Sequence, residues 1–264
     1  MKNSQDTLSV AIAGSGGSGV VTMGLLFLKV IAGAGYYGLM TRSSGPQIRG
    51  GESAVMLRLG ASPVSCQDDF FHLLLALDWL NFSRFADEIP LSGKSVVLHD
   101  PAMGDIPPEV IESGALVQEI SLKAAAKSIE GGRANMLALG MLAAILDIDK
   151  SAIEKAVNSV LGGKGAEVVA ASMNSIDVGF DSAPNLNDRP ALPPTPVVTP
   201  HWNISGNEAA GLGALRGGVR LVAAYPITPA SEVLEWMAPN LEKVGGALIQ
   251  AEDELASINM VIGA

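Results

Sequence analysis

Residues 8–32 read LSVAIAGSGGSGVVTMGLLFLKVIA and contain a complete strand–turn–helix pattern. Leu8–Ala13 is a short apolar run of the length expected for a buried strand, and Val20–Ala32 has helical character. Between them, Gly14–Gly19 supplies glycines that permit a tight turn and a close approach of the backbone to a ligand. Because a helix N-terminus attracts anions, the segment predicts an α/β fold that opens with a candidate anion site.

The alternation of strands and helices continues through the first 180 residues. Three more apolar segments are predicted strands, namely Ser53–Leu59, His72–Leu77 and Ser95–His99. Two more are predicted helices, Asn135–Leu146 and Ala152–Leu161. Strands that alternate with helices predict a Rossmann-like α/β domain with a mainly parallel sheet covered on both faces.

A proline-rich segment follows, and its six prolines predict an extended linker rather than a helix or a strand. They are Pro184, Pro190, Pro193, Pro194, Pro196 and Pro200. We therefore predict a first domain over residues 1–180, a linker over residues 181–203 and a second α/β domain that starts at residue 204.

The second domain is predicted to contain few elements. Helices are expected over Ser205–Arg216, over Ala230–Met237 and from Glu254 onward, with strands at Val219–Ala224 and Ala247–Gln250. Two strands are too few for an independent hydrophobic core. We therefore expect residues 204–264 to be the truncated start of a larger domain.

Composition restricts the classes of function. A formal net charge of −10 gives a nucleic-acid backbone no electrostatic reason to bind, so no nucleic-acid partner is expected. The sequence shows neither a signal-peptide pattern nor an apolar run of membrane-spanning length, which favours a soluble, cytoplasmic protein without a membrane partner.

Cys66 is the only cysteine, and a single cysteine excludes a cluster held by four thiolates of this chain. We predict that Cys66 is a small buried hydrophobic residue. The three histidines lack metal-ligand spacing, so no metal site is predicted.

The glycine loop fits the spacing G-x-G-x-x-G through Gly14, Gly16 and Gly19. A dinucleotide enzyme would also need an acidic residue after the second strand to hold a ribose, and none lies between Asp6 and Glu52. The residues support two interpretations of the glycine loop equally well. Either a phosphate-bearing ligand binds the loop, or the glycines only close the packing of strand against helix.

A second glycine-rich segment, Thr41–Gly51, carries Arg42 and Arg49 with hydroxyl groups between them. Arginine presents a planar fork of donors that suits phosphate or carboxylate. The alternative is a solvated loop, and we favour a function for the two arginines.

Two turns in the second domain follow its predicted strands. Tyr225–Ser231 reads YPITPAS, and Thr228 in it could bind a ligand or cap the next helix. Gln250–Glu254 places three acids in a helix's first turn, where acids are expected without any function. Ser205–Glu208 matches a capping box.

Three pieces of the chain together resemble the 2-oxoacid:ferredoxin oxidoreductases in which a gamma domain is fused ahead of the alpha domain. They are G-x-G-G-x-G-V at Gly14–Val20, I-R-G-G at Ile48–Gly51, and the run GNEAA…YPITPAS…AEDE…GA from Gly206 to Ala264. The last is long and specific, and the resemblance covers essentially the whole chain. It implies that residues 1–180 form the gamma domain and that residues 204–264 begin the pyrimidine-binding domain for thiamine diphosphate.

The resemblance also implies a reaction and its cofactors. A 2-oxoacid, with 2-oxoglutarate favoured, would be decarboxylated on thiamine diphosphate, its acyl group would pass to coenzyme A (CoA), and electrons would reach ferredoxin. A beta subunit would supply the diphosphate and Mg²⁺ site and a [4Fe–4S] cluster, in a dimer of alpha–beta heterodimers, a heterotetramer.

The resemblance assigns site residues as well. Glu254 would be the catalytic acid at the pyrimidine ring, with Glu252 as the alternative, and Tyr225, Pro226 and Ile227 would contact the cofactor. Thr228 and Arg49 would bind the 2-oxoacid. Gly14, Gly16, Gly19 and Arg42 would face CoA.

Two other classes remain as competitors. One is a non-catalytic nucleotide-binding assembly subunit, which the intact YPITP and AEDE segments disfavour. The other is an NAD(P)-binding Rossmann dehydrogenase, which the missing ribose acid disfavours.

Overall fold

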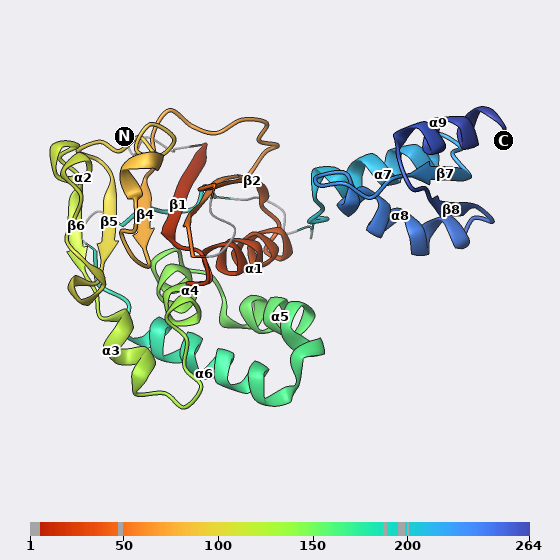
Figure 1. The fold of residues 1–264 in the computed structure, drawn as a ribbon. Coiled ribbons are helices and arrows are strands. Elements are labelled where there is room, and N and C mark those ends of the chain that lie inside the picture. Colours follow the sequence, from red (N-terminus) through yellow and green to blue (C-terminus); the bar gives the residue numbers. More distant parts are fainter. Residues whose placement is uncertain (1–5, 47–49, 187–188, 195–198, 200) are drawn as a thin grey trace. The chain divides into compact units, whose positions relative to one another are not determined.

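The predicted strand, glycine loop and helix at the start of the chain are all present in the computed structural model. This structure describes residues 6–46, 50–186, 189–194, 199 and 201–264. It divides into two units, Met1–His201 (unit 1) and Trp202–Ala264 (unit 2) (Figure 1). Each unit is an α/β structure, as the alternation of elements predicts.

Unit 1 is built on one sheet with the strand order β2-β3-β1-β4-β5-β6. Its strands are β1 (Thr7–Ser15), β2 (Tyr37–Ser44), β3 (Glu52–Gly60), β4 (Leu73–Ala76), β5 (Val96–His99) and β6 (Leu116–Glu119). The strands β1, β4, β5 and β6 pair in parallel, whereas β3 runs antiparallel to both β1 and β2. The sheet is therefore mainly parallel, as predicted, with an antiparallel hairpin at one edge.

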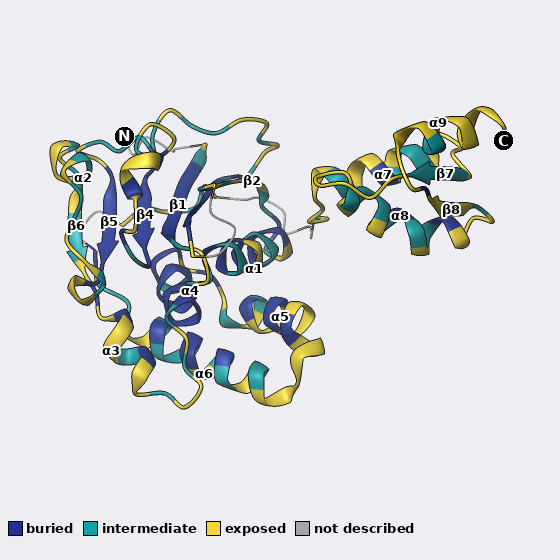
Figure 2. Ribbon diagram, in the orientation of Figure 1, coloured by how far each residue is buried: buried dark blue, intermediate teal, exposed yellow. Residues whose placement is uncertain are grey.

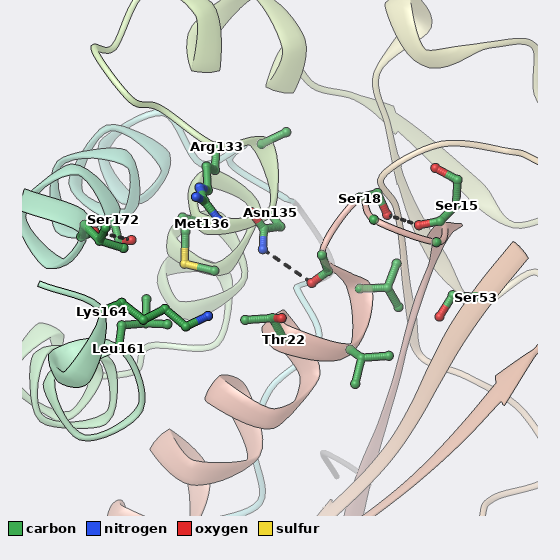
Figure 3. Close-up of a pocket in the computed structure, with 17 residues that line it drawn as sticks. Ser15, Ser18, Thr22, Ser53, Arg133, Asn135, Met136, Leu161, Lys164 and Ser172 are labelled. Atoms are coloured by element: carbon green, nitrogen blue, oxygen red, sulfur yellow. Dashed lines mark hydrogen bonds between the residues drawn. The ribbon is translucent and has the colours of Figure 1, made fainter. Parts of the chain in front are cut away.

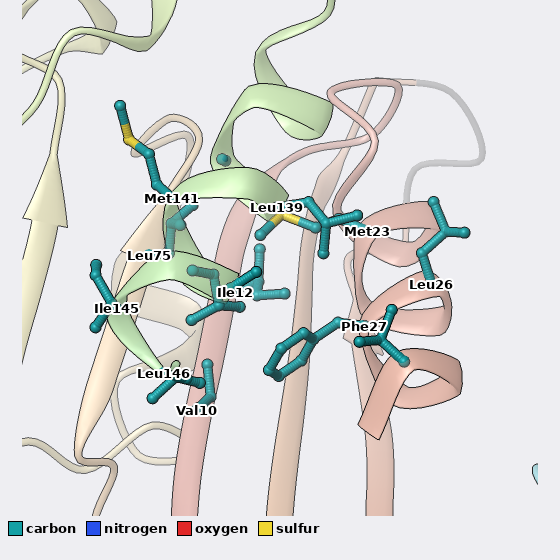
Figure 4. Packing of buried hydrophobic residues seen from close by; sticks show 14 of the residues in the cluster. Val10, Ile12, Met23, Leu26, Phe27, Leu75, Leu139, Met141, Ile145 and Leu146 are labelled. Carbon is teal, nitrogen blue, oxygen red and sulfur yellow. The ribbon is translucent and has the colours of Figure 1, made fainter. Parts of the chain in front are cut away.

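The longer helices of unit 1 cover one face of this sheet, and loops with short helical segments cover the other. The helices are α1 (Val20–Gly33), α2 (Pro108–Glu112), α3 (Leu122–Lys127), α4 (Ala134–Ile145), α5 (Lys150–Leu161) and α6 (Ala166–Asp181), with short 3-10 turns at η1 (Phe82–Phe85), η2 (Pro101–Met103) and η3 (Gly162–Lys164). On one face, Val10 and Ile12 pack with side chains of α1 and α4, including Phe27 and Leu139 (Figure 4). The central strand β1 is thus buried on both faces, because Ala11 and Ala13 pack on the opposite side.

Two glycines allow α4 and α6 to pack closely. A Cβ atom added at Gly140 would lie 2.8 Å from the carbonyl carbon of Ile176. One added at Gly179 would lie 2.7 Å from the carbonyl carbon of Leu137. Any larger residue would push the helices apart, and α6 forms one wall of the cavity described below.

Unit 2 consists of α7 (Gly206–Arg216), β7 (Leu221–Ala224), α8 (Ser231–Glu242), β8 (Ala247–Gln250) and α9 (Glu254–Ile262). Its two strands pair in parallel, with Ala224 opposite Gln250. Ser205 and Glu208 form the predicted capping box at the start of α7. Few residues of unit 2 are buried, and none of those in α9 is (Figure 2).

Several elements, and the exposure of one residue, differ from what the sequence predicts. Strand β2 includes Thr41–Ser44, so the segment predicted to be a loop begins inside an edge strand. Helix α6 was not predicted from the sequence; its two serines, Ser172 and Ser175, bond to carbonyl oxygens four residues earlier and so remain buried within the helix. The prediction that Cys66 is buried is wrong: it is exposed in the surface segment between β3 and β4.

Among the described residues, no helix is long and apolar enough to cross a membrane.

Candidate functional site

The glycine loop follows β1, the strand from which the chain connections run to opposite sides of the sheet. After β1 the chain passes through α1 to β2 on one side, whereas β4 lies on the other side of β1. Asp78, just beyond β4, accepts hydrogen bonds from the backbone N–H of Ser15 at 2.9 Å and from its hydroxyl at 2.7 Å. The carboxyl ends of neighbouring strands that diverge in this way are the usual place for a ligand in an open α/β sheet.

A cavity of about 600 Å³ opens directly beside this loop (Figure 3). Its polar wall includes Ser15–Gly19 and the first turn of α1, with Ser53 from β3. Its other walls come from α4, from the end of α5 with η3, and from α6. Such a volume is in the range of small-molecule sites.

The three glycines of the motif have different roles. Gly19 caps α1 with a φ of 91°, a left-handed conformation that favours glycine, and it lies against the side chain of Asn135. Gly16 donates its N–H to the carbonyl oxygen of Gly51, which holds the two glycine-rich segments together. Gly14 does not line the cavity, and a Cβ atom there would lie 2.9 Å from the Ser18 hydroxyl.

The arginine segment is only partly described. Arg42 lies on the exposed edge strand β2, paired in register with Val55, and lines neither this cavity nor the smaller one next to it. Arg49, together with Ile48, lies outside the described residues. Gly50 and Gly51 line the adjacent cavity of about 330 Å³, which shares Gly16 and Ser53 with the larger one.

Glu52 is a buried acid at this site that the sequence analysis did not single out. Its carboxylate accepts a hydrogen bond from Asn81 Nδ2 at 3.2 Å and pairs with Arg84 Nε at 2.9 Å. A hydrogen bond from its own backbone, the Asn81 amide and the Arg84 charge lower the pKa of Glu52. Glu52, which lines the smaller cavity, is therefore held ionised.

Other residues of the larger cavity were also missed by sequence reasoning. Arg133 is the N-cap of α4, Lys164 ends η3, and Asn135 donates to the carbonyl oxygen of Gly19 at 3.4 Å. These residues lie more than 100 positions after the glycine loop, and no local pattern links them to it. Only the packing of α4 and α6 brings them to the same cavity.

In unit 2, the two turns identified from the sequence lie at the same edge of the sheet. The N–H of Ala251 donates to the carbonyl oxygen of Ala224 at 3.0 Å, so the segments that follow β7 and β8 start side by side. Tyr225 and Glu254 line one open cavity of about 270 Å³, together with Ser257, Ile258 and Val261. Two of the residues that the resemblance assigned to one site, Tyr225 and Glu254, therefore line the same cavity.

The other assigned residues of unit 2 lie around this edge without lining that cavity. Pro226, Ile227, Thr228 and Glu252 are exposed. Thr228 does not cap α8, because the N-cap is Ala230 and no side chain bonds there. Asp253, rather than Glu254 in the first turn, caps α9 by accepting a hydrogen bond from the N–H of Ala256 at 2.7 Å.

Among the described residues, no group of three or more His, Cys, Asp or Glu side chains is placed to hold a metal ion.

The fold and the two motif-bearing edges define a Rossmann-like unit followed by an α/β unit of the kind found in 2-oxoacid oxidoreductases. Residues 9–182 match the family model of pyruvate ferredoxin/flavodoxin oxidoreductase, and residues 212–264 match the model of its thiamine-diphosphate-binding domain. The chain belongs to the pyruvate ferredoxin/flavodoxin oxidoreductase family.

Curated relatives agree with this family. The chain is 27% identical over 97% of its length to 2-oxoacid:ferredoxin oxidoreductase subunit alpha of Sulfolobus sp, of which the match covers 48%. A stretch of 61 residues is 57% identical to 2-oxoglutarate synthase subunit KorA of Archaeoglobus fulgidus, covering 23% of this chain and 18% of that one. The chain thus spans about half the length of the relative that it matches from end to end.

Solved structures extend the comparison to the fold. The 2-oxoglutarate:ferredoxin oxidoreductase of Magnetococcus marinus, solved with 2-oxoglutarate, coenzyme A and succinyl-CoA bound, has a TM-score of 0.80 and 31% identity over 98% of this chain and 46% of that one. The gamma subunit of the keto/oxoacid ferredoxin oxidoreductase of Geobacter sulfurreducens has a TM-score of 0.52 at 24% identity. It covers 67% of this chain and 97% of that subunit, and supports the fold alone.

Proposed function

We propose that this chain provides the CoA side and the pyrimidine side of the active centre in a CoA-acylating 2-oxoacid:ferredoxin oxidoreductase. The reaction joins a 2-oxoacid and CoA to give acyl-CoA and CO₂, and passes two electrons to ferredoxin. We favour 2-oxoglutarate as the substrate, because two relatives that match 61 residues of this chain carry the name 2-oxoglutarate synthase. The bound 2-oxoglutarate of the Magnetococcus marinus enzyme supports the same choice.

The observation that carries the proposal is the meeting of Tyr225 and Glu254 at one cavity on the carboxyl edge of β7 and β8. The match of residues 212–264 to a thiamine-diphosphate-binding domain supports this edge as the cofactor side. A cavity lined by a carboxyl group, an aromatic ring and the apolar Ile258 and Val261 suits a flat heteroaromatic ring with a polar nitrogen. The residues present therefore fit half of a pyrimidine site.

Thiamine diphosphate, when bound, supplies the carbon nucleophile for the keto group and the sink for the electrons left when CO₂ departs. Glu254 would hold a proton at the pyrimidine ring nitrogen, and this hydrogen bond favours the cofactor's reactive tautomer. Tyr225, Pro226 and Ile227 would border the ring. Glu252 is the alternative acid if Glu254 is not the one that contacts the ring.

We assign the 2-oxoacid to Thr228 and Arg49, whose hydroxyl and guanidinium groups suit its keto and carboxylate oxygens. Gly14, Gly16, Gly19 and Arg42 are assigned to the CoA side. The glycine loop beside a cavity of about 600 Å³ supports this part of the proposal.

The remaining half of the centre is assigned to a beta subunit, which would provide the diphosphate and Mg²⁺ site and a [4Fe–4S] cluster. A cluster of this kind usually takes four thiolates, and the 264 residues contain one cysteine. The assembly would be a dimer of alpha–beta heterodimers that passes electrons to ferredoxin.

The test is reduction of methyl viologen by the chain co-purified with its beta subunit. We expect dye reduction that requires both a 2-oxoacid and CoA, with 2-oxoglutarate preferred over pyruvate, and none from the chain alone. Robust reduction of NAD by the chain without a beta subunit would overturn the proposal in favour of a dehydrogenase.

A further inference from the structure

The larger cavity of unit 1 has an unusual charge for this protein. The chain carries 27 acidic and 17 basic residues, with a formal net charge of −10. Yet the described residues that line the cavity include Arg133 and Lys164 and no Asp or Glu. A cavity lined by two basic side chains and no acidic ones, in a protein of net negative charge, favours an anionic ligand.

The two cations are available to such a ligand. Within the described part of the chain, neither the Arg133 guanidinium nor the Lys164 ammonium forms an ion pair or a side-chain hydrogen bond. Both residues are exposed, so the solvent solvates them when the cavity holds only water. Figure 3 shows them on the α4 and η3 side of the cavity, across from the glycine loop.

The opposite wall provides a second place for negative charge. No described side chain caps α1, so the amides of its first turn, Val20–Thr22, face the cavity at a positive helix end. Ser53 also lines this wall and is only 8% exposed. Its hydroxyl has no hydrogen-bond partner among the described residues, and a ligand oxygen would satisfy it.

Between these two polar walls the cavity is apolar. Val20, Val21, Met136, Leu161 and Val168 line it. A volume of about 600 Å³ is far larger than an inorganic phosphate requires and suits a nucleotide. The arrangement therefore fits a nucleotide with phosphate groups at two positions of its sugar, one for each polar wall, and with its base against the apolar side chains.

We propose that Arg133 and Lys164 bind the 3′-phosphate of CoA, while the glycine loop and Ser53 bind its diphosphate and the apolar side chains contact its adenine. The choice of CoA as the ligand rests on the proposed function. The pair Arg133 and Lys164 is then what makes the site select CoA over nucleotides that lack the 3′-phosphate. Charge-assisted hydrogen bonds to phosphate give such discrimination. A ligand without the 3′-phosphate cannot form these bonds with the two cations and so binds more weakly.

The test compares two ligands that differ only in this phosphate, CoA and dephospho-CoA, by isothermal titration calorimetry with the full chain. We expect CoA to bind about tenfold or more tightly than dephospho-CoA. The variants Arg133→Gln and Lys164→Met should each weaken CoA binding about tenfold and leave dephospho-CoA binding nearly unchanged. Lys155→Met is the matched control, because it removes one positive charge from exposed α5 without touching the cavity.

Three results would overturn the inference: no CoA binding, equal affinity for the two ligands, or CoA binding by both variants as tight as in the unchanged chain. Each is independent of turnover. Selective CoA binding without 2-oxoacid-dependent dye reduction by the complex would support the site and overturn the proposed function. Dye reduction by the complex with no discrimination between the ligands would overturn the 3′-phosphate assignment and leave the proposed function standing.

Discussion

Unit 1 and unit 2 differ in how fully each surrounds its own candidate site. In unit 1, β1, β3 and β4 are almost entirely buried, and the cavity beside the glycine loop has walls from four parts of the same unit. In unit 2, both strands are intermediate or exposed, and the cavity at Tyr225 and Glu254 is open. Unit 1 therefore supplies the walls of its own candidate site, whereas the candidate site of unit 2 is a set of residues on an exposed surface.

Apolar side chains of unit 2 are also more exposed than those of unit 1. Leu255 and Ile262 of α9 are 73% and 75% exposed, and Ile258 in the cavity wall is 52% exposed. In unit 1, by contrast, the side chains that face α1 and α4 from the sheet are fully buried. We therefore expect unit 1 to account for most of the stability of the chain, since apolar burial is the main stabilising contribution.

Hydrogen exchange should show this contrast as the largest effect. We expect the amides of β1 and β3 to exchange at least on the order of 100-fold more slowly than those of β7 and β8, because strands in a dense core open only with global unfolding. Exchange of the full chain, followed by mass spectrometry of peptides, measures both units in one sample. Equal protection of the two sheets would contradict the comparison.

A substitution at the crossing of α4 and α6 should lower the stability of unit 1. Gly179→Ala is expected to lower the free energy of unfolding by about 2 kcal/mol, since its Cβ atom would meet the backbone of Leu137 and force the helices apart. Equilibrium unfolding in urea measures the change. Gly163→Ala is the control, because nothing lies within 4 Å of its added Cβ, and a similar loss in that variant would refute the packing argument.

A smaller effect is expected from pH. Burial lowers the pKa of His72 below its ordinary value of 6.5, and its Nδ1 accepts a hydrogen bond from the N–H of Ser9 at 3.0 Å. The unfolded chain then binds a proton more readily than the folded chain, so the free energy of unfolding falls as the pH drops below about 6.5. Urea unfolding at pH 8 and at pH 5.5 measures it.

His72→Asn keeps an acceptor for the Ser9 N–H and removes the titrating group. It should therefore reduce the loss of stability between pH 8 and pH 5.5. An unchanged pH dependence in this variant would assign the effect to other groups.

The sequence predicted the fold well where apolar residues form a regular pattern along the chain. The apolar runs of β1, β3, β4, β5 and β8 and the helices α1, α4, α5 and α7 lie where the pattern placed them. Strand β2 was missed because it is an edge strand with mixed polarity, and its Thr41–Ser44 end resembles a polar loop. Such a strand forms through pairing with β3, which is not a local property of the sequence.

The candidate sites divide in a similar way. The glycine loop is a local motif, so the sequence by itself singled out Gly16 and Gly19, whereas Glu254 was chosen among the acids after β8 only through the family resemblance. Arg133, Lys164 and Ser53 reach the loop's cavity only through tertiary packing, and Glu52 is recognised as held ionised only from its contacts. Arg42 lies on an exposed edge strand and lines neither cavity, so its assignment to the CoA side rests on the motif and the resemblance alone.

The most direct test of the account is the turnover of Glu254→Gln in the complex with the beta subunit. We expect 2-oxoacid-dependent dye reduction to fall at least about 100-fold, because glutamine cannot supply the carboxyl proton. CoA binding, which we propose takes place in unit 1, should be unchanged. Glu235→Gln, on the exposed face of α8, is the matched control and should keep full activity. Full turnover by Glu254→Gln, or loss of turnover in Glu252→Gln alone, would contradict the catalytic assignment.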